Sequence, residues 1–381
     1  MARIIVGSWM VRYPLGGNLS WTLQYLVGLK NLGHDVYLVE KYAYNNSCYN
    51  PVKKVMSNDC SYGTKVVSEL LGRFGLTNRW CFVQKGGVYH GLSKQKIKEV
   101  FLTADLYIDI GAHNRWAEES SSTLRVFIDV DPAFTQIKWH NNLVDNVPLP
   151  VYDHYYTIGM NVGTEGNEIP TNGIKWKYIF NPVNTQLFSR TLPLANASYT
   201  TIMNWQSYEC ITYNGISYGQ KDIEFEKFMS LPQWVNATLE IAVHGLNKAK
   251  AEMIHNHGWV INAAQEVTSS YDSFCKYLAN SKGEFSVCKN VYVATSSGWF
   301  SDKSAAYMAS GRPVVVQDTG FKTHLPVGKG LFAVNNLDEA QAAIQEIENN
   351  YSFHSQKAWE IACDYLEASK VLKKFTNELG I

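Results

Sequence analysis

The sequence predicts an α/β fold with two doubly wound domains that face each other across a cleft. Patterns typical of strands and helices alternate along most of the 381 residues. This alternation begins twice, at residue 3 and again at residue 199, and a segment rich in Pro, Gly and Asn at 164–184 separates the two series. Alternating strands and helices are typical of parallel sheets covered by helices. The chain is long enough for two such domains, each with its own core.

The first series begins with an apolar strand at 3–10, a loop rich in Pro and Gly, and a helix at 19–33 that ends at a glycine. A second strand follows at 34–40. A strand, a glycine loop, a helix and a further strand are how Rossmann-like domains begin. Residues 41–63 are rich in Asn, Tyr and Ser and indicate an inserted loop. The other elements predicted for this series are helices at 63–76 and 94–104 and strands at 105–114, 124–132 and 153–161.

The second series begins with a strand at 199–205 and a helix at 219–231. It continues with strands at 238–245, 259–264 and 283–289, and with helices at 249–258, 269–281, 337–350 and 353–379. We therefore divide the chain into a first domain at 1–180, a second domain at 195–352 and closing helices at 353–381.

Composition narrows the class of protein. Lys and Arg together number 34, as do Asp and Glu, so no net charge attracts the chain to nucleic acid or to anionic lipid. The seven cysteines form no CxxC pair, which indicates reduced core residues. The chain enters a strand at once and shows no signal peptide, and we expect a cytoplasmic protein. No apolar run approaches the roughly 20 residues of a membrane span, so no membrane partner is expected. The oligomeric state is not predicted.

The segment at 296–321 carries the first functional signal. Ser301, Asp302 and Ser304 have the residue types of a helix cap and first turn, and an Ala-rich helix follows them. Lys303 lies in that first turn, where a cation opposes the helix dipole unless an anion neutralises it. A helix start also offers free N–H groups to an anion. We interpret the segment as a diphosphate site; the alternative is a well-capped helix before a buried strand.

Here the sequence resembles a family. The stretch "GWFSDKSAAYMASGRPVVVQDTGF" at 298–321 resembles the nucleotide-sugar signature of GT-B glycosyltransferases. "PLGGN" at 14–18 resembles their glycine loop, and "YGQKDIEFEKF" at 218–228 resembles the segment with their diphosphate-binding lysine. The closing helices resemble the tail that crosses back to the first domain. The resemblance spans nearly the whole chain and extends to bacterial and phage proteins described only as glycosyltransferases.

The resemblance implies transfer of a sugar from a nucleotide-diphosphate sugar, of UDP type, to an acceptor hydroxyl. The sugar donor is then a co-substrate, and no further cofactor is implied. No DxD motif lies in a loop suited to Mg²⁺, so no metal is expected. The residues that the motifs and their surroundings indicate for donor binding are Gly16, Gly17, Asn18, Lys221, His244, Gly298, Ser301, Asp302, Lys303, Ser304, Asp318 and Thr319.

Two positions depart from the family pattern. Ala306 stands where a Glu usually binds the donor ribose. Asn18 stands where many inverting members carry a catalytic His, and an amide cannot take a proton at neutral pH. The sequence therefore leaves the catalytic base open, as well as the stereochemical outcome.

Candidate bases follow from strand ends, because doubly wound sheets bind ligands at the carboxyl ends of their strands. Asp129 and Asp131 follow an apolar run, and their alternative role is to cap the turn before a proline. His113 ends another predicted strand. Asp153 and His154 form an acid–histidine pair of the kind that orients a general base.

The acceptor is not fixed by any motif. The segments 42–63 and 113–122 combine aromatic and polar residues, which suit a sugar, a small aromatic molecule or a flipped nucleobase. A composition rich in Asn, Tyr and Lys suggests an AT-rich genome and allows a phage source, and hence the host cytoplasm. A hydroxylated or hydroxymethylated base in DNA then joins glycans and small molecules as an acceptor class. Zero net charge argues against DNA, although basic segments at 50–55, 73–80 and 93–100 could form a local face.

Other classes of protein share parts of this pattern. A nucleotide-sugar epimerase of the same fold needs no acceptor, and a non-catalytic nucleotide-sugar sensor needs no base. A periplasmic-type binding protein would require a signal peptide. An NAD-dependent oxidoreductase would require GxGxxG after the first strand, and "PLGGNLS" lacks that spacing even though Glu40 ends the next strand.

Overall fold

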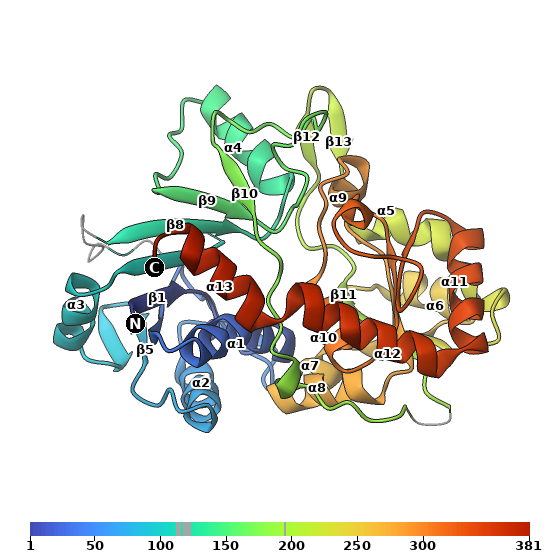
Figure 1. The fold of residues 1–381 in the computed structure, drawn as a ribbon, viewed down its shortest axis with the longest axis horizontal. Coiled ribbons are helices and arrows are strands. Elements are labelled where there is room, and N and C mark those ends of the chain that lie inside the picture. Colours follow the sequence, from blue (N-terminus) through green and yellow to red (C-terminus); the bar gives the residue numbers. More distant parts are fainter. Residues whose placement is uncertain (112–115, 117–122, 194–195) are drawn as a thin grey trace.

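The computed structural model describes residues 1–111, 116, 123–193 and 196–381, and the candidate base His113 lies outside them. Two sheets with packed helices lie side by side (Figure 1). The α/β class with two doubly wound domains is confirmed.

The first sheet has eight strands, and all neighbours are parallel except β5 and β6. In spatial order they are β10 (Trp176–Tyr178), β9 (His154–Thr157), β8 (Leu124–Asp129), β7 (Leu106–Ile110), β1 (Arg3–Gly7), β2 (Asp35–Lys41), β5 (Trp80–Gln84) and β6 (Val88–Gly91). The helices and the small hairpin of this domain are α1 (Gly16–Asn31), β3 (Cys48–Asn50), β4 (Val55–Ser57), α2 (Ser61–Arg73), α3 (Lys94–Leu102) and α4 (Phe134–Val144).

The second sheet has six parallel strands, in the order β15 (Val260–Ala263), β14 (Leu239–His244), β11 (Tyr199–Asn204), β16 (Gly283–Ser286), β17 (Val314–Gln317) and β18 (Leu331–Val334). A hairpin of β12 (Ile211–Tyr213) and β13 (Ile216–Tyr218) stands apart from it. The helices are α5 (Lys221–Phe225), α6 (Lys248–Asn256), α7 (Ala264–Thr268), α8 (Tyr271–Asn280), α9 (Asn290–Ala294), α10 (Asp302–Ala309) and α11 (Leu337–Asn349). Short 3-10 turns are η1 (Thr185–Leu187), η2 (Glu226–Phe228), η3 (Leu231–Gln233) and η4 (Phe321–Thr323).

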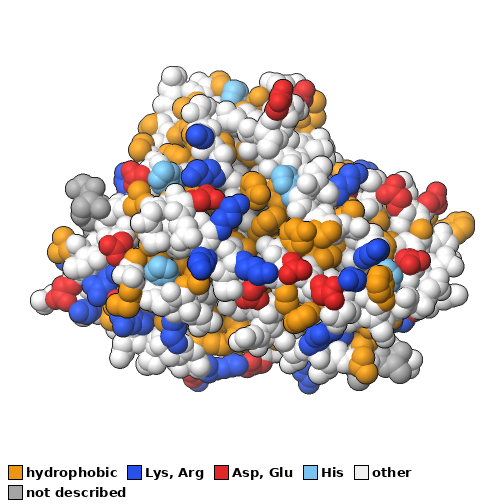
Figure 2. Space-filling model, in the orientation of Figure 1, with side chains coloured by type: hydrophobic (Ala, Val, Ile, Leu, Met, Phe, Trp, Pro, Cys, Tyr) orange, Lys and Arg blue, Asp and Glu red, His pale blue; other side chains and the backbone are white. Residues whose placement is uncertain are grey.

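The chain ends with α12 (Tyr351–Ile361), a π-helical turn η5 (Ala362–Leu366) and α13 (Ala368–Glu378). Helix α12 packs against α10 in the second domain, whereas α13 packs against α1 in the first (Figure 1). Gly28 permits this second contact, because a Cβ there would lie 2.5 Å from Leu372 Cδ1. On the face that carries α12 and α13, cationic and anionic side chains are interspersed (Figure 2).

Several boundaries differ from the sequence prediction. The helix expected from residue 19 begins at Gly16. The residues "GGNLS" contain no proline and no β-branched residue, so the helix continues back to the end of the preceding loop. The segment 164–184 is not only a linker, since β10 within it pairs with β9 at the edge of the first sheet. Strand β5 and helix α4 were not predicted. Their apolar residues lack a clear period, and burial in the tertiary structure decides their conformation.

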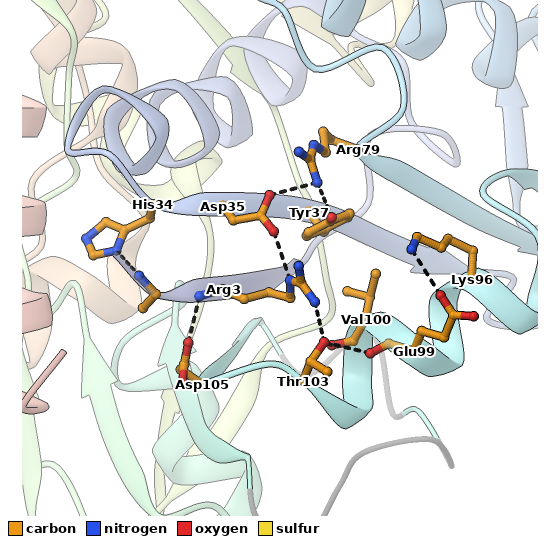
Figure 3. Close-up of polar contacts among 11 residues, drawn as sticks. Arg3, His34, Asp35, Tyr37, Arg79, Lys96, Glu99, Val100, Thr103 and Asp105 are labelled. Carbon is orange, nitrogen blue, oxygen red and sulfur yellow. Dashed lines mark hydrogen bonds and ion pairs between the residues drawn. The ribbon is translucent and has the colours of Figure 1, made fainter.

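Polar contacts join the amino ends of neighbouring strands in the first sheet (Figure 3). The Asp35 carboxylate accepts from Arg3 Nε at 2.8 Å and forms an ion pair with Arg79 at 2.7 Å. The backbone N–H of Arg3 donates to Asp105 Oδ2 at 2.7 Å. These contacts join the starts of β1, β2 and β7, so a ligand site belongs at the opposite, carboxyl edge.

Two further expectations concern the environment of the chain. All seven cysteines lie in the described part of the chain, and none of them forms a disulfide bond. Among the residues that the structure describes, no helix is both long and apolar enough to traverse a lipid bilayer.

Candidate functional site

A cleft lies between the domains at the carboxyl ends of their central strands. In each sheet the strand order reverses beside the first strand, between β1 and β7 and between β11 and β16, and such switch points are where doubly wound sheets bind ligands. One part, of about 340 Å³, we call the charged cleft; its functional lining is Gly17, Asp131, Tyr208, Lys221, Lys289, Tyr292, Ser301, Asp302 and Lys303. The adjoining part, of about 500 Å³, we call the apolar recess; it is lined by residues that include Tyr13, Leu15, Asn18, Tyr49, Met56, His244, Ala264 and Gln265.

Two helices begin at the charged cleft. Helix α10 begins after Ser301, whose Oγ accepts from the Lys303 N–H at 3.1 Å. Helix α1 begins at Gly16, and no side chain of the described residues caps its first turn. Helix starts carry partial positive charge and unpaired N–H groups. The cleft therefore presents two N-terminal ends of helices to a ligand, one from each domain.

Lys221 is a cation of this cleft that no described residue neutralises. It begins α5, directly after β13, and its side chain is half-buried. Within the described part of the chain, no group forms a hydrogen bond or ion pair with its ammonium. Burial, together with the nearby Lys303, lowers the pKa of Lys221 to about 8. An anion bound beside Lys221 would remove this penalty and restore a full positive charge.

Lys303 is paired within the protein. Its ammonium forms a buried ion pair with Glu284 of β16 and donates to Thr201 Oγ1 at 3.0 Å and Ser286 Oγ at 3.3 Å. The expectation that this lysine lacks a neutralising partner is wrong. Lys303 still lines the charged cleft, and its side chain keeps 11% exposure.

Asp131 joins the two domains. It follows β8 in the first domain, and its carboxylate accepts from Lys289 Nζ at 2.5 Å, from the Tyr208 hydroxyl at 2.6 Å and from the Tyr292 hydroxyl. Burial alone would raise the pKa of Asp131, but Lys289 and the hydroxyls outweigh it and hold that pKa below the ordinary value. The carboxylate therefore stays ionised in the cleft.

Three other candidate bases, Asp129, Asp153 and His154, do not line the cleft. Asp129 is fully buried and accepts from Gln136 at 2.9 Å and Thr157 at 2.7 Å, so its carboxylate faces the interior of its own domain and not the cleft. Asp153 and His154 lie at the amino end of β9, where Asp153 accepts from the Arg125 N–H at 2.8 Å. The pair therefore lies at the edge of the first sheet opposite to the carboxyl ends of the strands, where the cleft is found. Asp131 alone of the predicted acids at strand ends lies in the cleft among the described residues.

Four predicted donor residues serve the packing of the domains. Gly298 adopts a φ of 75° and lies against the backbone of Asn161, where a Cβ would come within 2.8 Å of the nitrogen. Ser304 is fully buried, so its hydroxyl does not reach a ligand. Asp318 forms an ion pair with Lys322 at 2.9 Å, and Thr319 donates to the Trp299 carbonyl at 2.6 Å. The sequence pattern gave the place of these four residues along the chain but could not give the direction of their side chains.

Three predicted residues lie where the two domains meet. Gly16 packs against α8, since a Cβ there would lie 2.3 Å from the Ser270 carbonyl oxygen. Asn18 Nδ2 donates to the carbonyl oxygens of Trp9 and Tyr13, both at 2.8 Å, and so holds the loop between β1 and α1. His244 ends β14, is exposed in the apolar recess and contacts Gln265 Nε2 at 3.0 Å.

Sequence reasoning missed four residues of the charged cleft and its floor. Lys289 follows the buried strand β16, a position that could have indicated it. Glu284 is an acid inside that strand, and a buried acid requires a partner. Tyr208 and Tyr292 carry no sequence signal, because only the tertiary structure brings them to Asp131. Among the described residues, no group of three or more His, Cys, Asp or Glu side chains could hold a metal ion.

Comparison with known proteins gives the fold. No family model and no curated protein sequence matches the chain. Solved structures do: an alpha-glucosyltransferase in complex with UDP and a 13-mer DNA containing a central A:G mismatch has a TM-score of 0.58 at 10% identity, over 100% of this chain and 99% of that chain. The fold is GT-B.

Further GT-B structures agree along their whole length. Sucrose-phosphate synthase from Thermosynechococcus elongatus has a TM-score of 0.56 at 11% identity, over 100% of this chain and 99% of that chain. HepE from Anabaena, in complex with UDP and glucose, has a TM-score of 0.56 at 11% identity, over 100% of both chains. At such identities the likeness concerns the GT-B fold alone, and the resemblance read from the motifs is confirmed at that level.

Proposed function

We propose that the protein transfers a sugar from a nucleoside diphosphate sugar, of UDP type, to an acceptor hydroxyl. The observation that carries the proposal is the ammonium of Lys221, which has no partner among the described residues and lies in the charged cleft of a GT-B fold beside the start of α10. A diphosphate placed there would gain a cation and helix N–H groups. In the reaction, the same donors would stabilise the negative charge that grows on the leaving diphosphate.

The two parts of the cleft fit the two ends of such a donor. The apolar recess combines aliphatic side chains with His244 and Gln265, which suits the base and ribose of a nucleoside. Gly17 lines both parts and leaves room for the diphosphate at their junction. The sugar would then point toward Asp131. A base role for Asp131 requires that its carboxylate first leave Lys289, since the three donors weaken it as a proton acceptor.

The acceptor remains among the three classes that the sequence leaves open. Tyr13, Tyr49 and Met56 of the first domain line the apolar recess and could contact a sugar, a small aromatic molecule or a flipped base. Support for DNA comes from the glucosyltransferase of similar fold that was solved with DNA. Binding of duplex DNA should weaken steeply between low and high salt, because it releases counterions from neutralised phosphates. An affinity that does not change with salt would argue for a glycan or a small molecule.

The donor is tested by thermal unfolding with UDP and UDP sugars. A ligand at about 100 times its dissociation constant should stabilise the fold by about 2.7 kcal/mol. Lys221→Met should abolish the shift, whereas Lys373→Met, on the exposed face of α13, should keep it. An equal shift in both variants would contradict the proposed site.

Two other functions fit a nucleotide-sugar site. An epimerase would change the donor sugar without an acceptor, and a sensor would bind the donor without turnover. Incubation of UDP sugars with the protein alone, followed by analysis of the sugar, tests the first. Turnover with any acceptor of a panel would contradict the second.

We also propose that the protein works in the cytoplasm. The seven cysteines form no disulfide bond in the described part of the chain, which supports a reducing compartment. Fractionation of cells that make the protein tests this location.

A further inference from the structure

The second domain builds a site for a carboxylate in the charged cleft. Lys289 Nζ and the hydroxyls of Tyr208 and Tyr292 converge on the Asp131 carboxylate, and Lys289 also donates to the Tyr208 oxygen at 3.1 Å. The Lys289 ammonium lies 4.2 Å from the ring centre of Tyr208 and 5.2 Å from that of Tyr292. We call these three side chains the carboxylate cradle. Each of them donates, so the cradle selects a negatively charged oxygen group.

The group that fills the cradle comes from the other domain. Asp131 follows β8 of the first domain, whereas all three donors belong to the second. Its side chain keeps 22% exposure and lines the charged cleft beside Lys221 and Asp302. The protein thus closes an anion site with its own carboxylate, and that carboxylate borders the charged cleft in which we place the sugar.

We propose that Asp131, held in the carboxylate cradle, makes the donor site selective for neutral sugars over uronic acids. The proposal rests on the function proposed above and adds the class of sugar. A uronic acid carries a carboxylate on its ring, which Asp131 would repel across a cleft of about 340 Å³.

Hydrogen bonding favours the neutral sugar in the same place. A carboxylate offers about four acceptor sites. Three donors of the cradle leave one for a sugar hydroxyl, and a hydroxyl can donate to it. The sugar carboxylate of a uronic acid has no proton to donate and no free cradle to enter. Discrimination between the two nucleotide sugars therefore combines a favourable contact with the neutral sugar and a repulsive contact with the uronic acid.

Removal of Asp131 should open the cradle to an external carboxylate. Dissociation constants of UDP-glucose and UDP-glucuronate are measured by calorimetry for the wild type, Asp131→Ala and Asp131→Asn. The wild type should prefer UDP-glucose, and the ratio of the two constants should shift toward UDP-glucuronate by about tenfold or more in Asp131→Ala. Asp131→Asn, which removes the charge and keeps the shape, should shift it in the same direction by less.

Two controls separate this effect from a general opening of the domains. The double variant Asp131→Ala/Lys289→Met lacks the cation of the cradle and should lose the gain for UDP-glucuronate. Asp153→Asn removes an acid at the amino edge of the first sheet and should leave the ratio unchanged. A general opening would alter both constants alike and leave their ratio as in the wild type.

The outcomes distinguish the inference from the function on which it rests. Unchanged ratios in Asp131→Ala and Asp131→Asn, with UDP-glucose still bound by the wild type, would overturn the inference alone. A gain that survives in the double variant would overturn it as well. A wild type that binds neither nucleotide sugar would overturn both proposals.

Discussion

Lys303 of α10 and Glu284 of β16 form a buried ion pair beneath the floor of the charged cleft. Glu284 is fully buried, and its second carboxylate oxygen has no hydrogen-bond partner among the described residues. Loss of one partner from such a pair leaves an uncompensated buried charge. The pair therefore serves the fold, whereas Lys221 has no partner among the described residues and can meet a ligand.

Lys303→Met should lower the free energy of unfolding by about 3–5 kcal/mol, because Glu284 would remain charged and buried. Urea denaturation measures this change. Lys303→Met/Glu284→Met should recover much of the loss, since no charge then remains unpaired. A single variant as stable as the wild type that no longer binds UDP would instead make Lys303 a ligand-binding residue.

The affinity for UDP should fall as the pH rises through about 8, the pKa of Lys221 in the free protein. A diphosphate binds the protonated ammonium of Lys221. Deprotonation of this group above that pH therefore weakens the binding of UDP. Calorimetric titrations between about pH 7 and about pH 9 avoid the second ionisation of the phosphate, which lies near 6. Lys221→Arg should bind UDP without this decline, because a guanidinium stays charged. A wild-type affinity that is constant over the range would contradict the assignment of Lys221.

Glu40→Ala should destabilise the first domain by about 3–5 kcal/mol. The Glu40 carboxylate is fully buried, pairs with Arg12 Nε at 3.0 Å and accepts from the N–H groups of Val11 and Arg12 at 2.6 and 2.8 Å. It thereby holds the loop that leads to α1. Chemical denaturation should show Arg12→Met/Glu40→Met to be more stable than Glu40→Ala. Equal stability of the two variants would contradict the pairing.

Burial raises the pKa of Glu40 to about 7, although Arg12 and the backbone donors oppose the shift. An acid with a raised pKa destabilises the fold when it is ionised. This residue's contribution to the free energy of unfolding should therefore fall as the pH rises from about 4.5 to about 7. Denaturation curves of the wild type and the double variant, compared over that range, isolate the contribution. If the difference in free energy of unfolding between the two proteins does not change with pH, the raised pKa of Glu40 is contradicted.

Gly16→Ala and Gly17→Ala should act in opposite directions. A Cβ at Gly16 would meet the Ser270 carbonyl oxygen at 2.3 Å, and the domains would have to separate, at a cost of about 1–3 kcal/mol. At Gly17 the nearest atom, Phe274 Cε2, is 3.6 Å away, and Ala is favoured in a helix by up to about 1 kcal/mol. Thermal unfolding without ligand compares the two. If Gly17→Ala lost stability and Gly16→Ala did not, the close packing of Gly16 against Ser270 between the domains would be contradicted.

Much of the architecture follows from local sequence. Alternating strands and helices predicted both sheets, since apolar runs and helical periods act over a few neighbouring residues. Resemblance to GT-B motifs indicated Lys221 and the glycines at 16 and 17, and the structure places them at the starts of α5 and α1, beside the cleft.

What a side chain faces was decided only by the tertiary structure. Asp129 and Asp131 are two residues apart, yet one is buried in its own domain and the other crosses to Lys289, 158 positions later. The sequence alone determined the two-domain α/β order and the elements that border the cleft, because those depend on local propensity and burial pattern. Pairing of charges depends on which segments meet in space, and this decided that Lys303 is neutralised, that Lys221 has no partner among the described residues and that Asp131 fills a site built by the other domain.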